Sequence, residues 1–181
     1  TDIHPQGLRR HIGVVPQDVV LFHDTLRGNV AYGKPDATDD ELWKVLEAGQ
    51  VADYVRTLPK GLDTRLGGEE GIAPSQGEAQ RLSIARALLI NPAIVILDEA
   101  TSSLDSLEEA RLQLAIRELL SRRTAFVIAH RLSTIRHSGL VVVMERGRVI
   151  EMGAPDALLA AKDGVFYRLH EAHFATGVFR G

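Results

Sequence analysis

The sequence predicts an α/β fold built around a mainly parallel sheet, and three observations support this prediction. Two short apolar runs, Ala93–Leu97 and Thr124–Ala129, have the length and composition of strands that are buried on both faces. A helical pattern from Ser75 to about Ile90 precedes the first run and stops at an Asn-Pro pair. Because a second helical pattern separates the two runs, strands and helices alternate, which is typical of a parallel sheet.

The segment before Ser75 is predicted to contain one strand and several short helices. The first ten residues, which include a proline and a glycine, are expected to form a turn. Ile12–Val15 is a short apolar run stopped by a proline, and it is predicted to be a strand. Thr38 and Glu41 have the spacing of a capping box that begins a helix. Other expected features are helices at about Thr25–Ala31 and Val51–Thr57, and a loose glycine-rich segment at residues 60–77.

The segment after Leu97 is predicted to alternate in the same way and to end in helices. Ser106 and Glu109 have capping-box spacing and are expected to begin a helix that runs to about Ser121. Turn residues between two apolar runs predict a hairpin. The hairpin strands are expected at Leu140–Met144 and Arg148–Glu151, and the last helices at Asp156–Ala161 and Val165–Phe174.

Composition excludes several classes of protein. The 21 Lys and Arg residues against 24 Asp and Glu residues give a formal net charge of −3, so a nucleic-acid partner held by bulk charge is not expected. No cysteine is present, which excludes disulfides, thiolate metal sites and a cysteine nucleophile. No run approaches the roughly 18 apolar residues of a membrane helix. With 45% apolar residues, the chain is expected to be globular.

Polar side chains follow three predicted strands, at the point where each strand ends. They are Gln17, the adjacent pair Asp98 and Glu99, and His130. Ligands of open α/β sheets bind beyond the carboxyl ends of the strands, so these residues predict one site. For the acidic pair alone, a hydrated strand end and a magnesium site with a water-polarising carboxylate are equally good interpretations. His130 taken alone is better explained as a histidine that caps a strand.

The motifs around these residues resemble those of the nucleotide-binding domains of ATP-binding cassette (ABC) transporters, exporter type. The resemblance spans about Leu8 to Phe174 and rests on several motifs in the family's order. They are the Q-loop-like segments Val15–Asp18 and Leu21-Phe22, the segment Gly68–Gly71 before the signature, the Walker B strand and D-loop Ile94–Asp105, and the switch-histidine loop Ile128–Thr134.

The resemblance implies a role for each matching residue. Gln17 would reach Mg²⁺ and the attacking water and relay to a transmembrane partner, and Asp98 would support Mg²⁺. Glu99 would be the catalytic base, and His130 would contact the γ-phosphate of ATP. Asp105 would act across a dimer interface. In isolation, none of these residues would identify the activity.

The signature motif departs from the family pattern. The usual Leu-Ser-Gly-Gly-Gln stands here as Pro74-Ser75-Gln76-Gly77-Glu78. Ser75, Gly77 and Glu78 are the candidate contacts to the nucleotide of a partner domain, since family cassettes pair head to tail. Glu78 would place a carboxylate where a phosphate binds, and Ser75 with Glu78 forms a capping box worth about 1 kcal/mol to the helix. The sequence therefore favours a weakened half-site.

A phosphate cradle of the form G-x-x-x-x-G-K-[ST] is missing. The segment Gly28–Pro35 comes near it, but it follows a predicted helix and ends in a proline that lacks both a hydroxyl and an N–H. In the family the cradle lies upstream of the Q-loop. The chain is thus expected to be an N-terminally truncated cassette of the P-loop NTPase type, with a helical subdomain at about 25–90 inserted in the core of residues 1–181 and C-terminal helices at about 155–174.

These observations predict the ATP-hydrolysing part of an ABC exporter that uses ATP and Mg²⁺. Its expected partners are a second nucleotide-binding domain and a transmembrane domain, at the cytoplasmic face of a membrane. The 181-residue chain alone is expected to bind Mg-ATP weakly and to hydrolyse little. One alternative is a degenerate, non-hydrolytic cassette that acts as a regulatory or interaction module. Another is a soluble cassette ATPase acting on DNA or ribosomes, which the absence of a basic stripe disfavours.

Overall fold

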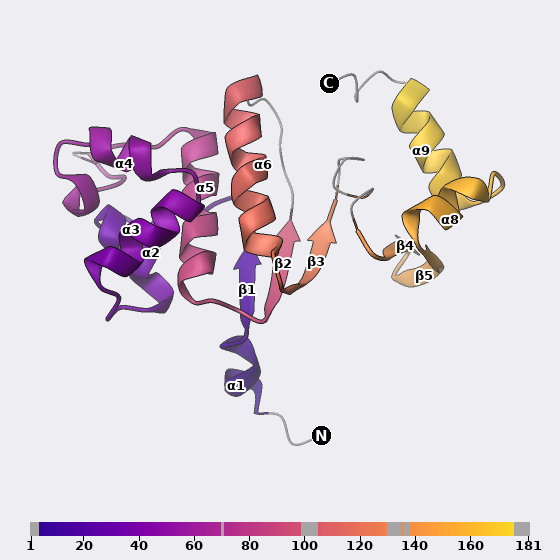
Figure 1. The fold of residues 1–181 in the computed structure, drawn as a ribbon, viewed down its shortest axis with the longest axis horizontal. Coiled ribbons are helices and arrows are strands. Elements are labelled where there is room, and N and C mark those ends of the chain that lie inside the picture. The colour runs from indigo at the N-terminus through magenta and orange to yellow at the C-terminus, as the bar shows by residue number, and fades with distance from the viewer. Residues whose placement is uncertain (1–3, 70, 99–104, 130–134, 136–137, 176–181) are drawn as a thin grey trace. The chain divides into compact units, whose positions relative to one another are not determined.

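The structure of the chain is a computed structural model that describes residues 4–69, 71–98, 105–129, 135 and 138–175. It divides into two compact units, Thr1–Ile128 and Ala129–Gly181. The first unit holds a three-stranded sheet and most of the helices (Figure 1). Within the described parts of the chain, no helix has the length and apolar character needed to cross a membrane.

The sheet of the first unit is parallel, as the sequence predicts. Its strands are β1 (Ile12–Val15), β2 (Ile94–Asp98) and β3 (Thr124–Ile128), in the order β1-β2-β3. Val15 pairs with Leu97, and Leu97 pairs with Val127. The three carboxyl ends are therefore level with one another.

The helices of the first unit also lie close to their expected positions. In chain order they are α1 (Pro5–Arg9), α2 (Leu26–Val30), α3 (Asp39–Ala48), α4 (Ala52–Thr57), α5 (Gln76–Leu89) and α6 (Ser106–Leu120), with short 3₁₀ turns at Ala31–Gly33 and Gly61–Asp63. The expected turn in the first ten residues is wrong, since α1 forms there. Pro5 stands at the first helical position, where its fixed φ suits a helix and its missing N–H costs no bond.

Helix α5 joins two hydrophobic cores. One core lies among the helices, where Leu82 and Ala85 of α5 meet side chains of α2, α3 and α4. The other lies under the sheet, where Ile84 and Leu88 of α5 pack with β1, β2 and α6. Because α5 is covered on opposite sides, it is buried around most of its circumference rather than along one stripe.

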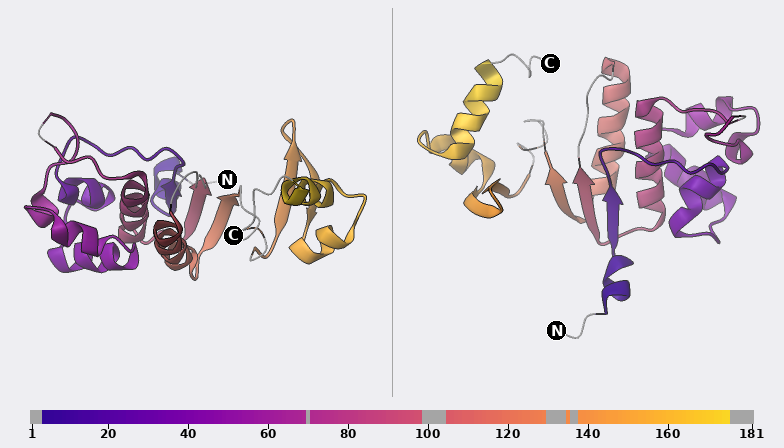
Figure 2. Two further views of the ribbon diagram at one scale, coloured as in Figure 1. Left: turned by 90° about the horizontal axis from the view of Figure 1, so that it is seen from above. Right: turned by 180° about the vertical axis from the view of Figure 1, so that it is seen from behind.

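Burial of the strands is one-sided, which corrects the expectation of strands buried on both faces. Helices α5 and α6 lie on the same side of the sheet (Figures 1 and 2). Val95 and Leu97 face them and are buried, whereas Ile96 on the other face is half-buried. Phe126 of β3 is 61% exposed. Periodicity identified the strands correctly. It could not show that, among the described residues of this unit, helices cover only one face of the sheet.

Two local predictions are also corrected. Helix α6 is capped by Asp105, whose carboxylate accepts the N–H groups of Leu107 and Glu108, and not by Ser106. Asp105 stands one residue earlier and has the better capping side chain. The glycine-rich segment is not loose throughout, because Leu62 and Leu66 within it are buried and a backbone bridge ties Leu66 to Ile72.

The second unit contains the predicted hairpin and helices. Strands β4 (Val141–Glu145) and β5 (Arg148–Gly153) are antiparallel and joined at Arg146 and Gly147, both with positive φ. Positive φ at both turn positions gives the twist that tight hairpins favour. Two helices follow, α8 (Pro155–Ala160) and α9 (Val165–Ala175). The carboxylate of Glu151 accepts the N–H groups of Val165 and Phe166, each at 2.7 Å, and so ties α9 to β5.

Candidate functional site

Two predicted site residues lie at the carboxyl edge of the parallel sheet. Asp98 is the last residue of β2 and is half-buried. Gln17 is exposed and lies two residues beyond the end of β1. Since Val15 is level with Leu97 in the register, both polar side chains belong to the same edge. This is the edge where open α/β sheets bind ligands.

Two other predicted site residues cannot be placed. Glu99 follows Asp98 directly, and His130 follows the end of β3 by two residues, but both lie outside the described residues. Their roles remain predictions that rest on the order of the sequence.

The donor set at this edge suits a hard cation that keeps other ligands. The carboxylate of Asp98 and the amide oxygen of Gln17 are oxygen donors of the type that Mg²⁺ prefers. In residues 4–69, 71–98, 105–129, 135 and 138–175, no group of three or more His, Asp or Glu side chains forms a complete metal cage. Mg²⁺ commonly binds through one or two protein oxygens together with water and phosphate, so the two residues fit it.

The N-terminus of α5 carries the signature-like residues, and its geometry explains Glu78. The hydroxyl of Ser75 accepts the N–H of Glu78 at 3.3 Å, and the Glu78 carboxylate accepts the N–H of Ser75 at 2.7 Å. The predicted capping box is therefore present. The carboxylate folds back onto a helix end that would otherwise attract an anion. Gly77 is buried in the first turn beside it.

The N-terminus of α6 carries Asp105, the candidate residue of the dimer interface. Its carboxylate caps the helix at 2.9 Å and 3.0 Å from two backbone nitrogens. Asp105 is exposed, so the cap lies at the surface of the unit.

Sequence reasoning missed a buried charged pair that links these two helix ends. Arg81 of α5 is only 2% exposed, and its Nη1 donates to Oε2 of Glu108 in α6 at 2.6 Å. The available signal was weak: an arginine followed by apolar residues in the predicted helix from Ser75 to about Ile90.

The segment Gly28–Pro35 is not a phosphate cradle, as the sequence predicted. Gly28 lies inside α2, and the residues up to Gly33 continue as a 3₁₀ turn. Lys34 is paired with the carboxylate of Glu41. A Cβ at position 28 would lie 2.1 Å from a carboxylate oxygen of Asp24, so a larger residue there would displace that exposed side chain.

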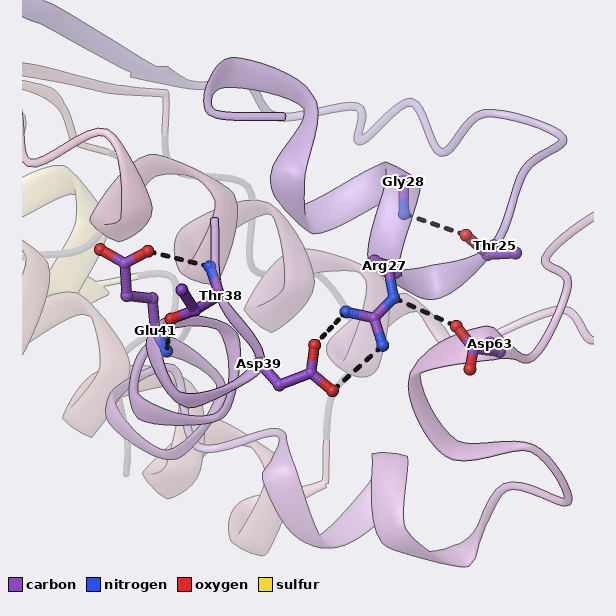
Figure 3. Close-up of polar contacts among 7 residues, drawn as sticks. All are labelled: Thr25, Arg27, Gly28, Thr38, Asp39, Glu41 and Asp63. Atoms are coloured by element: carbon purple, nitrogen blue, oxygen red, sulfur yellow. Dashed lines mark hydrogen bonds and ion pairs between the residues drawn. The ribbon is translucent and has the colours of Figure 1, made fainter. Parts of the chain in front are cut away.

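Ion pairs instead tie α2 to its neighbours (Figure 3). The guanidinium of Arg27 donates to both carboxylate oxygens of Asp39 and, at 3.1 Å, to Asp63. The hydrogen bond from Arg27 lowers the pKa of Asp39, and the bond from Lys34 lowers the pKa of Glu41. The predicted capping box of Thr38 and Glu41 is present at the start of α3.

Comparison with known proteins gives a consistent family. Residues 1–102 match the model of the ABC transporter family. The ATP-dependent lipid A-core flippase of Thiobacillus denitrificans is 49% identical over 96% of this chain and 30% of its own length. A β-(1→2)glucan export ATP-binding/permease protein of Rhodopseudomonas palustris is 50% identical over 96% of this chain and 28% of its own length.

A solved structure agrees in fold. A bacterial Atm1-family ABC exporter with ATP bound is 41% identical, with a TM-score of 0.81 over 93% of this chain and 29% of that chain. The chain thus spans about 30% of the length of the relatives that it matches.

Proposed function

The chain belongs to the ABC transporter family, and we propose that it supplies the Walker B, signature and switch-histidine part of the ATPase in an exporter. The observation that carries this proposal is the position of both Gln17 and Asp98 at the carboxyl edge of a parallel sheet. ATP is the nucleotide of the family, and this edge is where its phosphates would meet those oxygen donors.

Each residue has a distinct part in the proposed reaction. Asp98 and Gln17 would hold Mg²⁺, which supplies charge neutralisation on the phosphate oxygens. Glu99 would take the proton of the attacking water as general base. His130 would donate to the γ-phosphate oxygens and stabilise the charge that develops there.

The proposed partners follow from the lengths and names of the relatives. We propose that this stretch works beside membrane-spanning segments at the cytoplasmic face of a membrane and pairs with a second nucleotide-binding domain. The two relatives are named for different cargoes, lipid A-core and β-(1→2)glucan, yet this stretch is 49% and 50% identical to them. The shared stretch is therefore suited to the common ATP-driven step rather than to the choice of cargo.

Replacing Glu99 tests the proposed activity. Glu99→Gln in the complete exporter should slow ATP hydrolysis by about 10²–10⁴-fold, the usual contribution of a positioned base, while ATP binding persists. Hydrolysis is measured as phosphate release, and binding as retention of labelled ATP. The matched control is Glu118→Gln on the exposed surface of α6, which should hydrolyse normally. An unchanged rate in Glu99→Gln would remove this residue from the catalytic role.

One observation favours a second function. The Glu78 carboxylate occupies the N-terminal cap of α5, where a partner's phosphate would otherwise be attracted. A regulatory cassette that binds a competent partner would have such a weakened half-site. In that case the unmodified protein would show no hydrolysis of its own, and Glu78→Gln would strengthen ATP-dependent pairing.

A further inference from the structure

Arg81 is the largest side chain that is fully buried among the described residues of the chain. It lies in the second turn of α5, and its Nη1 donates to Glu108 at 2.6 Å. Its Nε is also buried and has no hydrogen-bond partner within the described part of the structure. Among the described residues, the Arg81 side chain therefore has one strong contact, and that contact leads out of its own helix.

Such a pair is a poor source of stability. Removing two charges from water is costly, and apolar side chains of similar size often serve a fold equally well or better. What a buried ion pair does provide is a fixed geometry between the elements that carry its two charges. The pair therefore fixes α5 and α6 relative to one another, together with the residues beside it on each helix.

The pair joins the beginnings of two helices that both carry candidate site residues. On α5, Arg81 stands one turn after Glu78, whose carboxylate accepts the N–H of Ser75. On α6, Glu108 lies in the first turn, and its own N–H is bound by Asp105 at 3.0 Å. On α6 a hydrogen bond thus links the cap directly to Glu108. On α5 the cap and Arg81 are joined by the first turn of the helix itself.

We propose that Arg81 is a positioning residue that, through Glu108, fixes the signature end of α5 relative to Asp105. This inference rests on the proposed function, with Ser75 and Gly77 as contacts to the nucleotide of a partner domain and Asp105 as a residue that acts across the dimer interface. Arg81 itself touches no nucleotide. Its ion pair sets the spacing at which the two helix ends meet the partner.

In the described part of this unit, the other ion pairs have more exposed cations. Arg56 binds Glu47 at 2.7 Å and Asp53 at 3.0 Å, but its side chain is 51% exposed. Exposed pairs contribute little and are screened by solvent. Arg56 is therefore a matched control: it has the same chemistry and similar distances but no link between helix caps.

The test measures ATP hydrolysis by the complete exporter with Arg81→Met, Arg81→Lys, Glu108→Gln and the double variant Arg81→Met/Glu108→Gln. A displacement of about 1 Å at a reacting centre can cost about 10²-fold, so kcat per folded molecule should fall at least about tenfold in Arg81→Met. The KM for ATP should change little, because the edge formed by Gln17 and Asp98 is untouched.

The comparison variants show whether the ion pair is the cause. Arg81→Lys, which keeps a charged donor, should recover part of the loss. The double variant should be no worse than Arg81→Met, since both changes remove the same contact. Arg56→Met should retain full kcat.

The readouts separate positioning from folding alone. The folded fraction of each variant is measured by cooperative unfolding, and kcat is divided by it. A pair with only a structural role would leave this corrected kcat at the unmodified value. If Arg81→Met does not fold, Glu108→Gln decides the matter, because Glu108 is 24% exposed and the neutral amide removes the ion pair while it keeps the size of the side chain.

Each result has one meaning. If the corrected kcat of Arg81→Met equals that of the unmodified protein, the positioning role is overturned and the proposed ATPase stands. Where Arg81→Met does not fold, an unchanged corrected kcat of Glu108→Gln has the same meaning. No hydrolysis by the unmodified exporter overturns the proposed ATPase and this inference with it. A reduced corrected kcat with normal Arg56→Met supports the inference.

Discussion

Asn29 is the residue whose side chain organises the segment after the Q-loop-like motif. Its amide donates to the carbonyls of Phe22 and Thr25, each at 3.0 Å, and its oxygen accepts the N–H of Phe22 at 2.7 Å. Arg86 donates to the same side-chain oxygen at 3.2 Å and to the Asn29 carbonyl at 2.8 Å. Asn29 is 1% exposed, so no water can replace these partners. Burial also lowers the pKa of Arg86.

Asn29→Ala should therefore destabilise the chain strongly for a single small change. It would leave the Phe22 N–H and one bond of Arg86 without this partner in a part-buried place, which predicts a loss of about 1–3 kcal/mol in the free energy of unfolding. Urea denaturation measures the loss. Lys44→Ala, at an exposed position in α3, should change the free energy by less than about 0.5 kcal/mol. Equal midpoints for the two variants would show that Asn29 does not hold this segment.

Exposed ion pairs join α3 to Arg27 of α2 and to Lys34 in the segment between the two helices. Because their acidic partners titrate, the stability that these pairs contribute depends on pH. The pKa of Asp39 is lowered below 3.8 mainly by its hydrogen bond from Arg27. The pKa of Glu41 is lowered below 4.5 first by Lys34 and then by the backbone of Thr38. A carboxylate with a lowered pKa in the folded state contributes stability that is fully present above its unfolded pKa. That contribution is lost as the pH falls through the folded pKa.

We expect the melting temperature to fall as the pH is lowered from about 5 towards 3, and Asp39→Asn and Glu41→Gln should each remove part of that fall. The matched control is Asp40→Asn, in the same first turn of α3 but without an ion pair to the described residues. Salt should reduce the effect, because the pairs are exposed to solvent. An identical pH slope in Asp39→Asn and Asp40→Asn would rule out the Arg27 pair as its source.

At the scale of elements, the sequence determined most boundaries because their signals are local. The capping boxes at Thr38 and Ser75 each involve residues three apart, so a pattern can find them. The strand ends that place Gln17 and Asp98 follow from short apolar runs in the same way. The Arg81–Glu108 pair joins residues 27 positions apart, and no local pattern contains it. The burial of β3 was mispredicted for a related reason, since burial depends on what packs against a strand.

At the scale of the whole unit, one face of the sheet is apolar and exposed. Val14 and Phe126 are 56% and 61% exposed, and Ile128 is 54% exposed. Register places Val14 and Phe126 on either side of Ile96, so they form a continuous row across the strands. Beside this row, β3 is an edge strand in the described sheet. Contiguous apolar surface and an open edge both favour association with other molecules.

The 181-residue chain, prepared by itself, should therefore associate as its concentration rises, and Phe126→Lys should oppose this. Phe126 is at the open edge, so a lysine there both breaks the apolar row and charges the strand that would pair. Sedimentation velocity over a range of concentrations measures the association. Leu114→Lys is the matched control, since Leu114 is 50% exposed but lies on α6 away from the row. The lysine at 126 should shift the distribution towards monomer, whereas the lysine at 114 should leave it unchanged. If both variants behave alike, general charge and not this face governs association, and the exposed row is then an ordinary part of the surface.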